Sequence, residues 1–236
     1  MAKKGNISIF VPHNGCPQQC SFCNQKTITG KSEQPTPSNV ENAVKKALAK
    51  KGYKYEIAFF GGSFTAIDRD YMVSLLKAAF AFLDNERIYG IRISTRPDFI
   101  DNEVLDILKK YGVTSVELGA QSMDDEVLAA NLRGHTSAQV ESASKLIKSY
   151  GFELGLQMMT GLYKDTDEKA VSSAEKIIAL KPDTVRIYPT VVLKGTMLAD
   201  LYEQKIYKPQ TVDDAANLCT RLIPMFENAG IKIIRI

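Results

Sequence analysis

Residues 91–122, IRISTRPDFIDNEVLDILKKYGVTSVELGAQS, carry the pattern that decides the fold class. Two short, mostly apolar runs, Ile91–Thr95 and Ser115–Leu118, flank a longer amphipathic stretch over Glu103–Tyr111. Asp101 before that stretch and a glycine after it are typical helix boundaries. A strand, a helix and a second strand in this order predict two parallel strands joined by a right-handed crossover.

The same alternation extends along the whole chain. The expected strands are Ile7–Pro12, Tyr55–Phe60, Ile91–Thr95, Ser115–Leu118, Glu153–Met159, Thr184–Val192 and Ile231–Ile236. The expected helices are Val40–Lys51, Tyr71–Leu83, Glu103–Tyr111, Val140–Tyr150, Ala170–Leu180 and Val212–Asn228, with a short helical turn after Asp124. Several strands are near-continuous Ile, Val, Phe and Leu, which indicates burial on both faces. Six strand–helix units predict an α/β fold, either a doubly wound sheet or part of a (β/α) barrel.

Composition and charge exclude several classes of protein. Of the 236 residues, 44% are hydrophobic and 24% charged, as in ordinary globular proteins and unlike disordered or collagen-like chains. We expect one domain over residues 1–236, because no linker or repeat divides the chain. No apolar run approaches the ~20 residues that cross a bilayer, and no signal-peptide core follows the start. We therefore expect a cytoplasmic protein with no membrane partner.

The first 54 residues are basic, with nine Lys and two Glu, a charge of +7 in a chain of net +3. Such a segment is either a nucleic-acid footprint or a solvated surface. Lys45, Lys46, Lys50 and Lys51 recur at helical spacing, which favours a solvated helix face.

Three of the four cysteines, Cys16, Cys20 and Cys23, lie within eight residues. Such a cluster in an intracellular chain indicates metal binding rather than disulfides. Three thiolates on one loop can ligate three irons of a 4Fe–4S cluster and leave the fourth iron open to a small molecule. The alternative is a structural zinc completed by His13 or Cys219. Cys219 lies on an apolar helical stripe and is expected to be a buried core thiol, so the cluster is favoured.

Polar or glycine-rich residues follow the expected strands. Beyond the cysteines these are Gly61-Gly62-Ser63, Ser94-Thr95-Arg96-Pro97, Gly119-Ala120-Gln121-Ser122, Thr160-Gly161 and Tyr188-Pro189-Thr190. The carboxyl ends of strands hold the sites of α/β sheets and barrels alike. One large pocket at this rim is therefore predicted.

The CxxxCxxC spacing, with the aromatic Phe22 before the third cysteine, resembles the signature of the radical S-adenosylmethionine (SAM) superfamily. The resemblance implies a partial (β/α)6 TIM-type barrel with parallel strands and outer helices, a 4Fe–4S cluster and SAM. It also implies an electron from an external donor such as flavodoxin or ferredoxin. Reductive cleavage of SAM then yields a 5′-deoxyadenosyl radical that abstracts a hydrogen from the substrate.

Further motifs resemble the SAM-binding elements of this family. The stretch around Gly61 and Gly62 resembles its glycine motif, whose backbone receives the methionine amino group. The resemblance implies that Gln121 meets the ribose and that Arg133 pairs with the methionine carboxylate, a use that suits a guanidinium fork. The SAM-binding residues implied are Phe22, Gly61, Gly62, Ser63, Ser94, Arg96, Gln121, Ser122, Arg133 and Gln157. Ser63 and Ser94 stand where relatives commonly have an acid.

The stretch VELGAQS at 116–122, with RGHT at 133–136, resembles a subgroup around oxygen-independent coproporphyrinogen oxidase and the catalytic subunit of Elongator. The short chain favours the queuine lyase family, which releases 7-aminomethyl-7-deazaguanine from queuine in queuosine salvage. The substrate expected is then a modified nucleobase. The pocket candidates are His13, Asn14, Asn24, Glu117, Tyr188 and Lys194. Two alternatives stay open: Elongator-type modification of the tRNA wobble uridine, and a non-enzymatic zinc-binding α/β module.

Overall fold

The computed structural model describes residues 3–12, 19–24 and 33–236. In these parts of the chain one sheet contains the strands β1 (Lys3–Val11), β2 (Tyr53–Gly61), β3 (Ile88–Thr95), β4 (Val113–Gln121), β5 (Glu153–Thr160), β6 (Thr184–Pro189) and β7 (Lys232–Arg235). The helices are α2 (Pro37–Leu48), α3 (Arg69–Phe80), α4 (Asn102–Lys110), α5 (Asp125–Ala130), α6 (Ser137–Ser149), α7 (Asp167–Ala179), α8 (Met197–Glu203) and α9 (Val212–Asn228).

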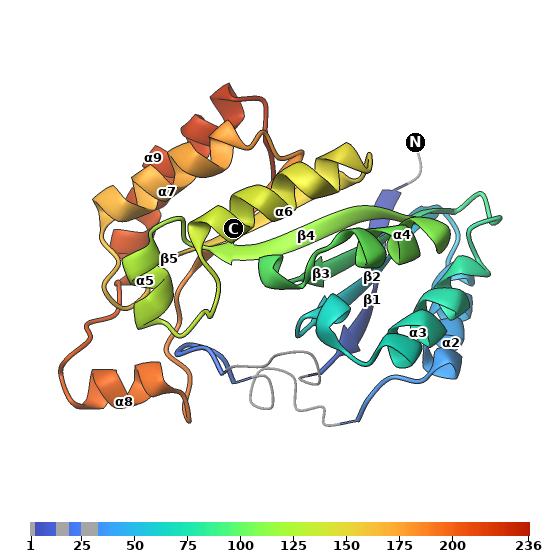
Figure 1. Cartoon of the computed structure of the whole chain (residues 1–236), viewed down its shortest axis with the longest axis horizontal. Helices are drawn as coiled ribbons and strands as arrows, with labels where there is room; N and C mark the ends of the chain where they lie inside the picture. The colour runs from blue at the N-terminus through green and yellow to red at the C-terminus, as the bar shows by residue number, and fades with distance from the viewer. Residues whose placement is uncertain (1–2, 13–18, 25–32) are drawn as a thin grey trace.

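The strands are ordered β1 to β7 across the sheet, and every neighbouring pair is parallel. A doubly wound sheet reverses its strand order in the middle, so this order excludes that alternative. The sheet curls into a half-barrel with helices around its outer side (Figure 1). The α/β partial barrel expected from the sequence is confirmed, with seven strands. The single domain over residues 1–236 stays a prediction.

The apolar core lies between the sheet and its outer helices. Phe59 of β2, Leu105 of α4 and Phe226 of α9 are fully buried there. Burying a side chain of this size contributes roughly 1.5–3 kcal/mol. The apolar runs therefore hold the helices on the outer side of the sheet and leave its inner side for the site.

Several element boundaries differ from the sequence-based expectation. Helix α2 begins at Pro37 rather than Val40, because Thr36 forms a capping box with Asn39 and proline is favoured in the first turn. Strand β6 ends at Pro189, three residues before the expected end. Helix α8 was not expected, since its seven residues are too few to display a helical period.

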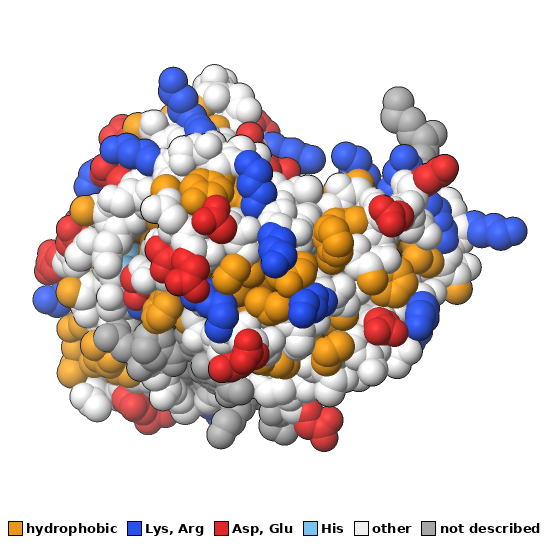
Figure 2. All heavy atoms as spheres, turned by 45° about the vertical axis from the view of Figure 1, so that its right-hand side comes forward, with side chains coloured by type: hydrophobic (Ala, Val, Ile, Leu, Met, Phe, Trp, Pro, Cys, Tyr) orange, Lys and Arg blue, Asp and Glu red, His pale blue; other side chains and the backbone are white. Residues whose placement is uncertain are grey.

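The charges of the outer surface are mixed. On the face shown in Figure 2, Lys and Arg side chains lie interspersed with Asp and Glu. Lys45, Lys46, Lys50 and Lys51 are exposed, and Lys45 lies 3.3 Å from Glu41 one helical turn away. Lys45 and Lys46 lie on the solvated face of α2, as the sequence favoured, whereas Lys50 and Lys51 are exposed just beyond its end at Leu48.

No helix in the described parts of the chain combines the length and apolarity needed to cross a membrane. The cytoplasmic location remains a prediction.

His135, which follows the end of α5, gives the fold a specific pH dependence. Its ring is buried, and Nε2 lies 3.2 Å from the carbonyl oxygen of Ala120. Burial, followed by the charge of Arg133, lowers the pKa of His135 to about 4. The unfolded chain takes up this proton near pH 6.5 and the folded chain only near pH 4. The stabilisation is therefore present above pH 6.5 and is lost as the pH falls towards 4.

We expect the free energy of unfolding to fall by about 2–3 kcal/mol between pH 7 and pH 4.5 on account of His135. Urea unfolding of the wild type and of His135→Gln at both pH values measures this difference. The variant should lose that part of the pH dependence. An equal pH dependence in the two proteins would contradict the assignment.

Candidate cofactor and substrate site

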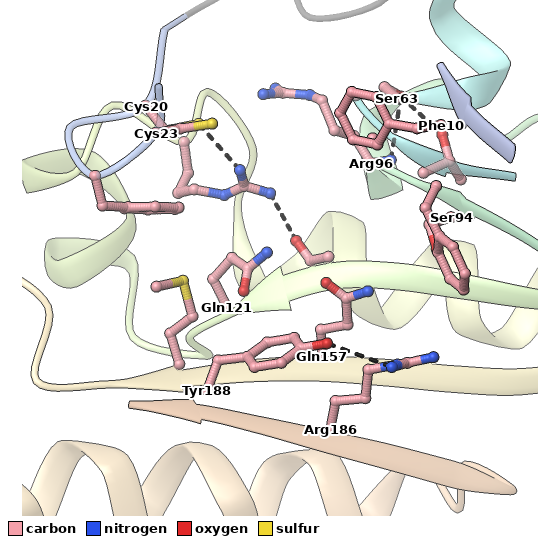
Figure 3. Close-up of a pocket in the computed structure, with 18 of the residues that line it drawn as sticks. Phe10, Cys20, Cys23, Ser63, Ser94, Arg96, Gln121, Gln157, Arg186 and Tyr188 are labelled. Carbon is pink, nitrogen blue, oxygen red and sulfur yellow. Dashed lines mark hydrogen bonds between the residues drawn. The ribbon is translucent and has the colours of Figure 1, made fainter. Parts of the chain in front are cut away.

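A cavity of about 620 Å³ occupies the inner side of the half-barrel. The lining residues are Ser8, Phe10, Cys20, Phe22, Cys23, Phe60, Gly61, Gly62, Ser63, Ser94, Thr95, Arg96, Gly119, Gln121, Arg133, Gln157, Met159, Arg186, Tyr188 and Arg235. Cys20 and Cys23 lie at one end, and Arg186 lies at the other, beyond Gln157 and Tyr188 (Figure 3). A large pocket expected from the strand ends is therefore present, but Thr160 and Gly161 do not line it, and Gly161 lines a second cavity of about 590 Å³ instead.

Most of the expected site residues line this cavity. These are Cys20, Phe22, Cys23, Gly61, Gly62, Ser63, Ser94, Arg96, Gln121, Arg133, Gln157 and Tyr188. Among the remaining candidates, Asn24, Glu117, Ser122 and Lys194 are not part of the lining. His13, Asn14 and Cys16 lie outside the described residues.

The segment holding Cys20 and Cys23 is anchored by Ser21, one of the two residues between them. The Ser21 amide donates to the carbonyl of Asn131 at 3.1 Å, and the Ser21 carbonyl accepts from the Leu198 amide at 2.8 Å. The Ser21 hydroxyl donates to Oδ1 of Asn131 at 2.6 Å. These bonds fix the segment between the end of α5 and the start of α8, and so place both cysteines at the cavity.

Asn24 and Lys194, both expected in the substrate pocket, meet each other instead. The side-chain amide of Asn24 donates to the carbonyls of Lys194 and Gly195 at 3.3 Å each. The contact ties the cysteine segment to the loop before α8. Lys194 takes part through its backbone.

Cys219 does not join the other cysteines. It lies in the apolar core on α9 with 7% of its surface exposed, as the sequence predicted. In the parts of the chain that the structure describes, no three His, Cys, Asp or Glu side chains gather to hold a metal. The place of Cys219 in the apolar core argues against a zinc site that it would complete. The alternative zinc site completed by His13 lies outside the described residues.

Arg133 lies beside Cys20. Its Nη1 donates to the Cys20 sulfur at 3.0 Å, and its Nη2 donates to the carbonyl of Gly119 at 2.7 Å. Arg133 Nε and Gln121 Oε1 are buried without a hydrogen-bond partner among the described residues. A buried polar atom without a partner costs about 1–3 kcal/mol. These atoms therefore suit a bound polar ligand.

Two unusual backbone conformations, at Gly61 and Gln121, shape the lining of the cavity. Gly61 has φ +128°, and a Cβ on it would overlap the carbonyl oxygen of Val11. Gln121 has φ +67°, a conformation that non-glycine residues seldom adopt. Strain of this kind is concentrated at binding and catalytic sites. The glycine thus permits an approach of β1 and β2 that no other residue allows.

The polar groups at the ends of β2 and β3 have different roles. The Ser63 hydroxyl lies 2.7 Å from the Thr95 hydroxyl and accepts from the Arg96 amide at 3.2 Å. The Arg96 guanidinium binds the Asp98 carboxylate at 2.7 Å. The Ser94 hydroxyl is buried without a partner in the described parts of the chain. Ser94 is therefore the freer of the two serines to contact a ligand.

Ser122 is directed away from the cavity. Its hydroxyl lies 3.2 Å from that of Ser173 on α7 and accepts from the Asp124 amide at 3.1 Å. These contacts position α5 and α7. The geometry therefore gives no support to the SAM-binding role predicted for Ser122 from the sequence.

Glu117 lies behind the cavity lining and is 1% exposed. Its Oε1 lies 2.6 Å from Arg186 Nε and accepts a hydrogen bond from Gln157, and its Oε2 lies 3.7 Å from Arg92 Nη1. Glu117 therefore holds two lining side chains, Arg186 and Gln157, in place rather than lining the pocket itself.

Arg92 extends this network towards the start of the strands. It binds Glu56 at 2.7 Å and Glu153 at 2.8 Å. Burial opposes its charge, but the hydrogen bonds to these carboxylates raise the pKa of Arg92 above its usual value. The guanidinium therefore stays charged inside the half-barrel.

Thr95 and Gly119, expected at the strand ends, also line the cavity, whereas six lining residues were missed from the sequence: Ser8, Phe10, Phe60, Met159, Arg186 and Arg235. A usable signal was the alternation along each strand, since every second residue faces the inside of a barrel. Met159 lies two residues from Gln157, and Arg186 two from Tyr188. Both pairs obey this rule.

A model of the radical SAM superfamily matches residues 10–177, more than two thirds of the chain. The chain belongs to the radical SAM superfamily. A second model, of the radical SAM C-terminal domain, matches residues 182–236. As a radical SAM enzyme, the protein uses a 4Fe–4S cluster and SAM. The unpartnered atoms of Arg133 and Gln121, and the close approach that Gly61 permits in the same cavity, fit a cofactor of this size and polarity.

Other proteins resemble this radical SAM chain over most of its length. The tRNA uridine(34) acetyltransferase of Dehalococcoides mccartyi is 27% identical over 86% of this chain and 52% of that protein. Human Elongator complex protein 3 is 30% identical over 76% of this chain and 37% of that protein. The solved structure of Elp3 from the archaeon Methanocaldococcus infernus has a TM-score of 0.75 at 20% identity, covering all of this chain and 57% of that one. The chain thus spans about half or less of these curated relatives.

Proposed function

We propose that this radical SAM enzyme acts on the wobble uridine of tRNA, at position 34. The observation that carries the proposal is the similarity to tRNA uridine(34) acetyltransferase over 86% of the chain. The short chain and the subgroup motifs favour queuine lyase, with Elongator-type modification as the alternative. The relatives favour that alternative. Membership of the radical SAM superfamily also favours an enzyme over the non-enzymatic zinc-binding module.

Within this proposal Cys16, Cys20 and Cys23 hold the cluster, and Gly61, Gly62, Gln121, Arg133 and Gln157 hold SAM. The bound cofactors supply the one-electron cleavage of SAM and hence an organic radical that removes hydrogen from the substrate. Arg133 orients a carboxylate beside Cys20. Gln157, held by Glu117, offers polar contacts half-way down the cavity. Phe10, Phe22, Phe60 and Met159 add apolar surface to the same cavity.

The test uses the anaerobically reconstituted holoprotein with SAM and either dithionite or reduced flavodoxin, the class of external donor expected. We expect 5′-deoxyadenosine formation to rise with a tRNA carrying uridine at position 34. A matched tRNA with cytidine there should not raise it. Stimulation by queuine, with release of 7-aminomethyl-7-deazaguanine, would restore the lyase and overturn the proposal.

Arg133→Ala should weaken SAM binding about 10–100-fold, because a charge-assisted pair of about 2 kcal/mol is lost. Anaerobic calorimetric titration of the reconstituted protein measures the dissociation constant. Arg69→Ala is the control, since Arg69 forms a partly exposed ion pair with Glu103 at 3.7 Å, outside the cavity. An unchanged SAM affinity in Arg133→Ala would remove this residue from the site.

A further inference from the structure

The half-barrel is open along one side. Its edge strands β1 and β7 lie at opposite ends of the strand order and are not paired with each other in the described residues. The cavity nevertheless has lining residues on both edges, Ser8 and Phe10 on β1 and Arg235 on β7. It therefore extends from the cysteine end to this lateral opening.

Two arginines stand together at that opening. Arg186 of β6 is directly opposite Arg235 of β7 in the strand register, and both line the cavity. The Arg186 side chain is 10% exposed. Its guanidinium lies 5.6 Å from the centre of the Phe60 ring, so it reaches from β6 towards β2. Arg235 is exposed.

The nearby carboxylates do not balance both charges. Glu117 is the carboxylate that faces Arg186, at 2.6 Å. The other acids of the network, Glu56 and Glu153, bind Arg92. Arg235 has no ion-pair partner within residues 3–12, 19–24 and 33–236. The charge of Arg235 is therefore not balanced by an ion pair with the described residues. It lies at the opening next to Arg186, which Glu117 holds in place.

We propose that Arg186 and Arg235 form an anion subsite that binds a phosphate of the polynucleotide substrate. The inference rests on the proposed function and names the group that this end of the site recognises. A guanidinium fork matches the geometry of phosphate oxygens.

Phe60 and Tyr188 also line the cavity and both contact Arg186, so they offer aromatic rings near the opening for a base. A single nucleotide entering from the side would leave its phosphate on the arginines and carry its base towards Cys20 and Cys23.

The first measurement is binding of a labelled anticodon stem-loop RNA to the reconstituted holoprotein, by fluorescence anisotropy over a range of salt concentrations. Loss of one phosphate contact in a single-stranded loop should lower the slope of log affinity against log salt by about 0.7. We expect this change in Arg235→Ala, with an affinity about 5–10-fold weaker, and a near-wild-type slope in Arg235→Lys.

Lys232→Ala is the matched control. Lys232 lies on the same strand, is exposed and carries the same charge, but does not line the cavity. Its slope should stay at the wild-type value. An equal decrease of the salt slope in Lys232→Ala and Arg235→Ala would overturn the subsite, because it would indicate non-specific electrostatic attraction between the basic surface and the RNA.

A second measurement separates the subsite from the tRNA function. The wild type should bind uridine 5′-monophosphate more tightly than uridine, and Arg235→Ala should lose that preference. RNA binding that Arg235→Ala leaves unchanged would overturn the subsite and leave the proposed function standing. An Arg235-dependent preference for the monophosphate without any RNA binding would support the subsite and overturn the tRNA substrate. Absence of both would overturn both.

Discussion

Cys20→Ala should purify and reconstitute with far less iron and sulfide than the wild type and form no measurable 5′-deoxyadenosine. A cubane cluster held by three thiolates loses one of its protein ligands in this variant. The Cys20 side chain is buried, and its sulfur receives a hydrogen bond from Arg133. No other described cysteine is placed to replace it, because Cys219 lies in the core on α9.

The fold should survive this change, since the apolar core is built from the sheet and its outer helices rather than from the cysteine segment. Far-ultraviolet circular dichroism and the visible absorption of the cluster measure the two properties separately. Cys219→Ala is the matched control: it removes a thiol of equal size and should keep the full iron content and 5′-deoxyadenosine formation. A Cys20→Ala protein with wild-type iron and visible absorption would overturn the ligand assignment.

Glu117→Gln should reduce the free energy of unfolding by about 3–5 kcal/mol, the cost of breaking a buried ion pair from one side. The variant keeps the shape of the side chain but removes the charge between Arg186, at 2.6 Å, and Arg92, at 3.7 Å. Among the described residues, no other carboxylate then pairs with Arg186. Urea unfolding at pH 7, with the change in midpoint and slope recorded, measures the effect.

Glu126→Gln is the control for this prediction. Glu126 also faces two cations, Lys169 at 2.8 Å and Lys164 at 3.4 Å, but on the surface. Water screens exposed pairs, so this variant should be indistinguishable from the wild type. If Glu117→Gln and Glu126→Gln changed the free energy of unfolding equally, the buried ion-pair network around Glu117 would have no special role in stabilising the cavity lining.

Much of the fold was predictable because its signals are local. The apolar runs, polar caps and terminal glycines each act within one turn or one strand, and seven parallel strands follow from their alternation. Helix α8 and the start of α2 escaped prediction for local reasons too. Helix α8 has only seven residues, and α2 begins earlier than expected because Thr36 forms a capping box with Asn39.

The cysteine loop, the Gly61 turn and Arg133 could be selected from the sequence because their residue types are unusual at those spacings. Glu117 was selected but misplaced, since a strand residue gives no sign of whether it lines a cavity or supports a residue that does. Arg186 and Arg235 were not selected. Arginines on strands are ordinary by themselves, and their proximity depends on the pairing of β6 with β7.

The order of residues along the chain is thus enough to predict the parallel α/β architecture and to select the cysteine loop as a candidate cluster site, because short-range periodicity and spacing encode them. The depth of the cavity, the lateral opening and the charge left on Arg235 arise only when the sheet curls. Those features depend on contacts between residues that are far apart in the sequence. Glu117 and Arg186, for example, are 69 positions apart and meet because of strand register and burial. Register and burial are collective properties of the folded sheet, which no single segment contains.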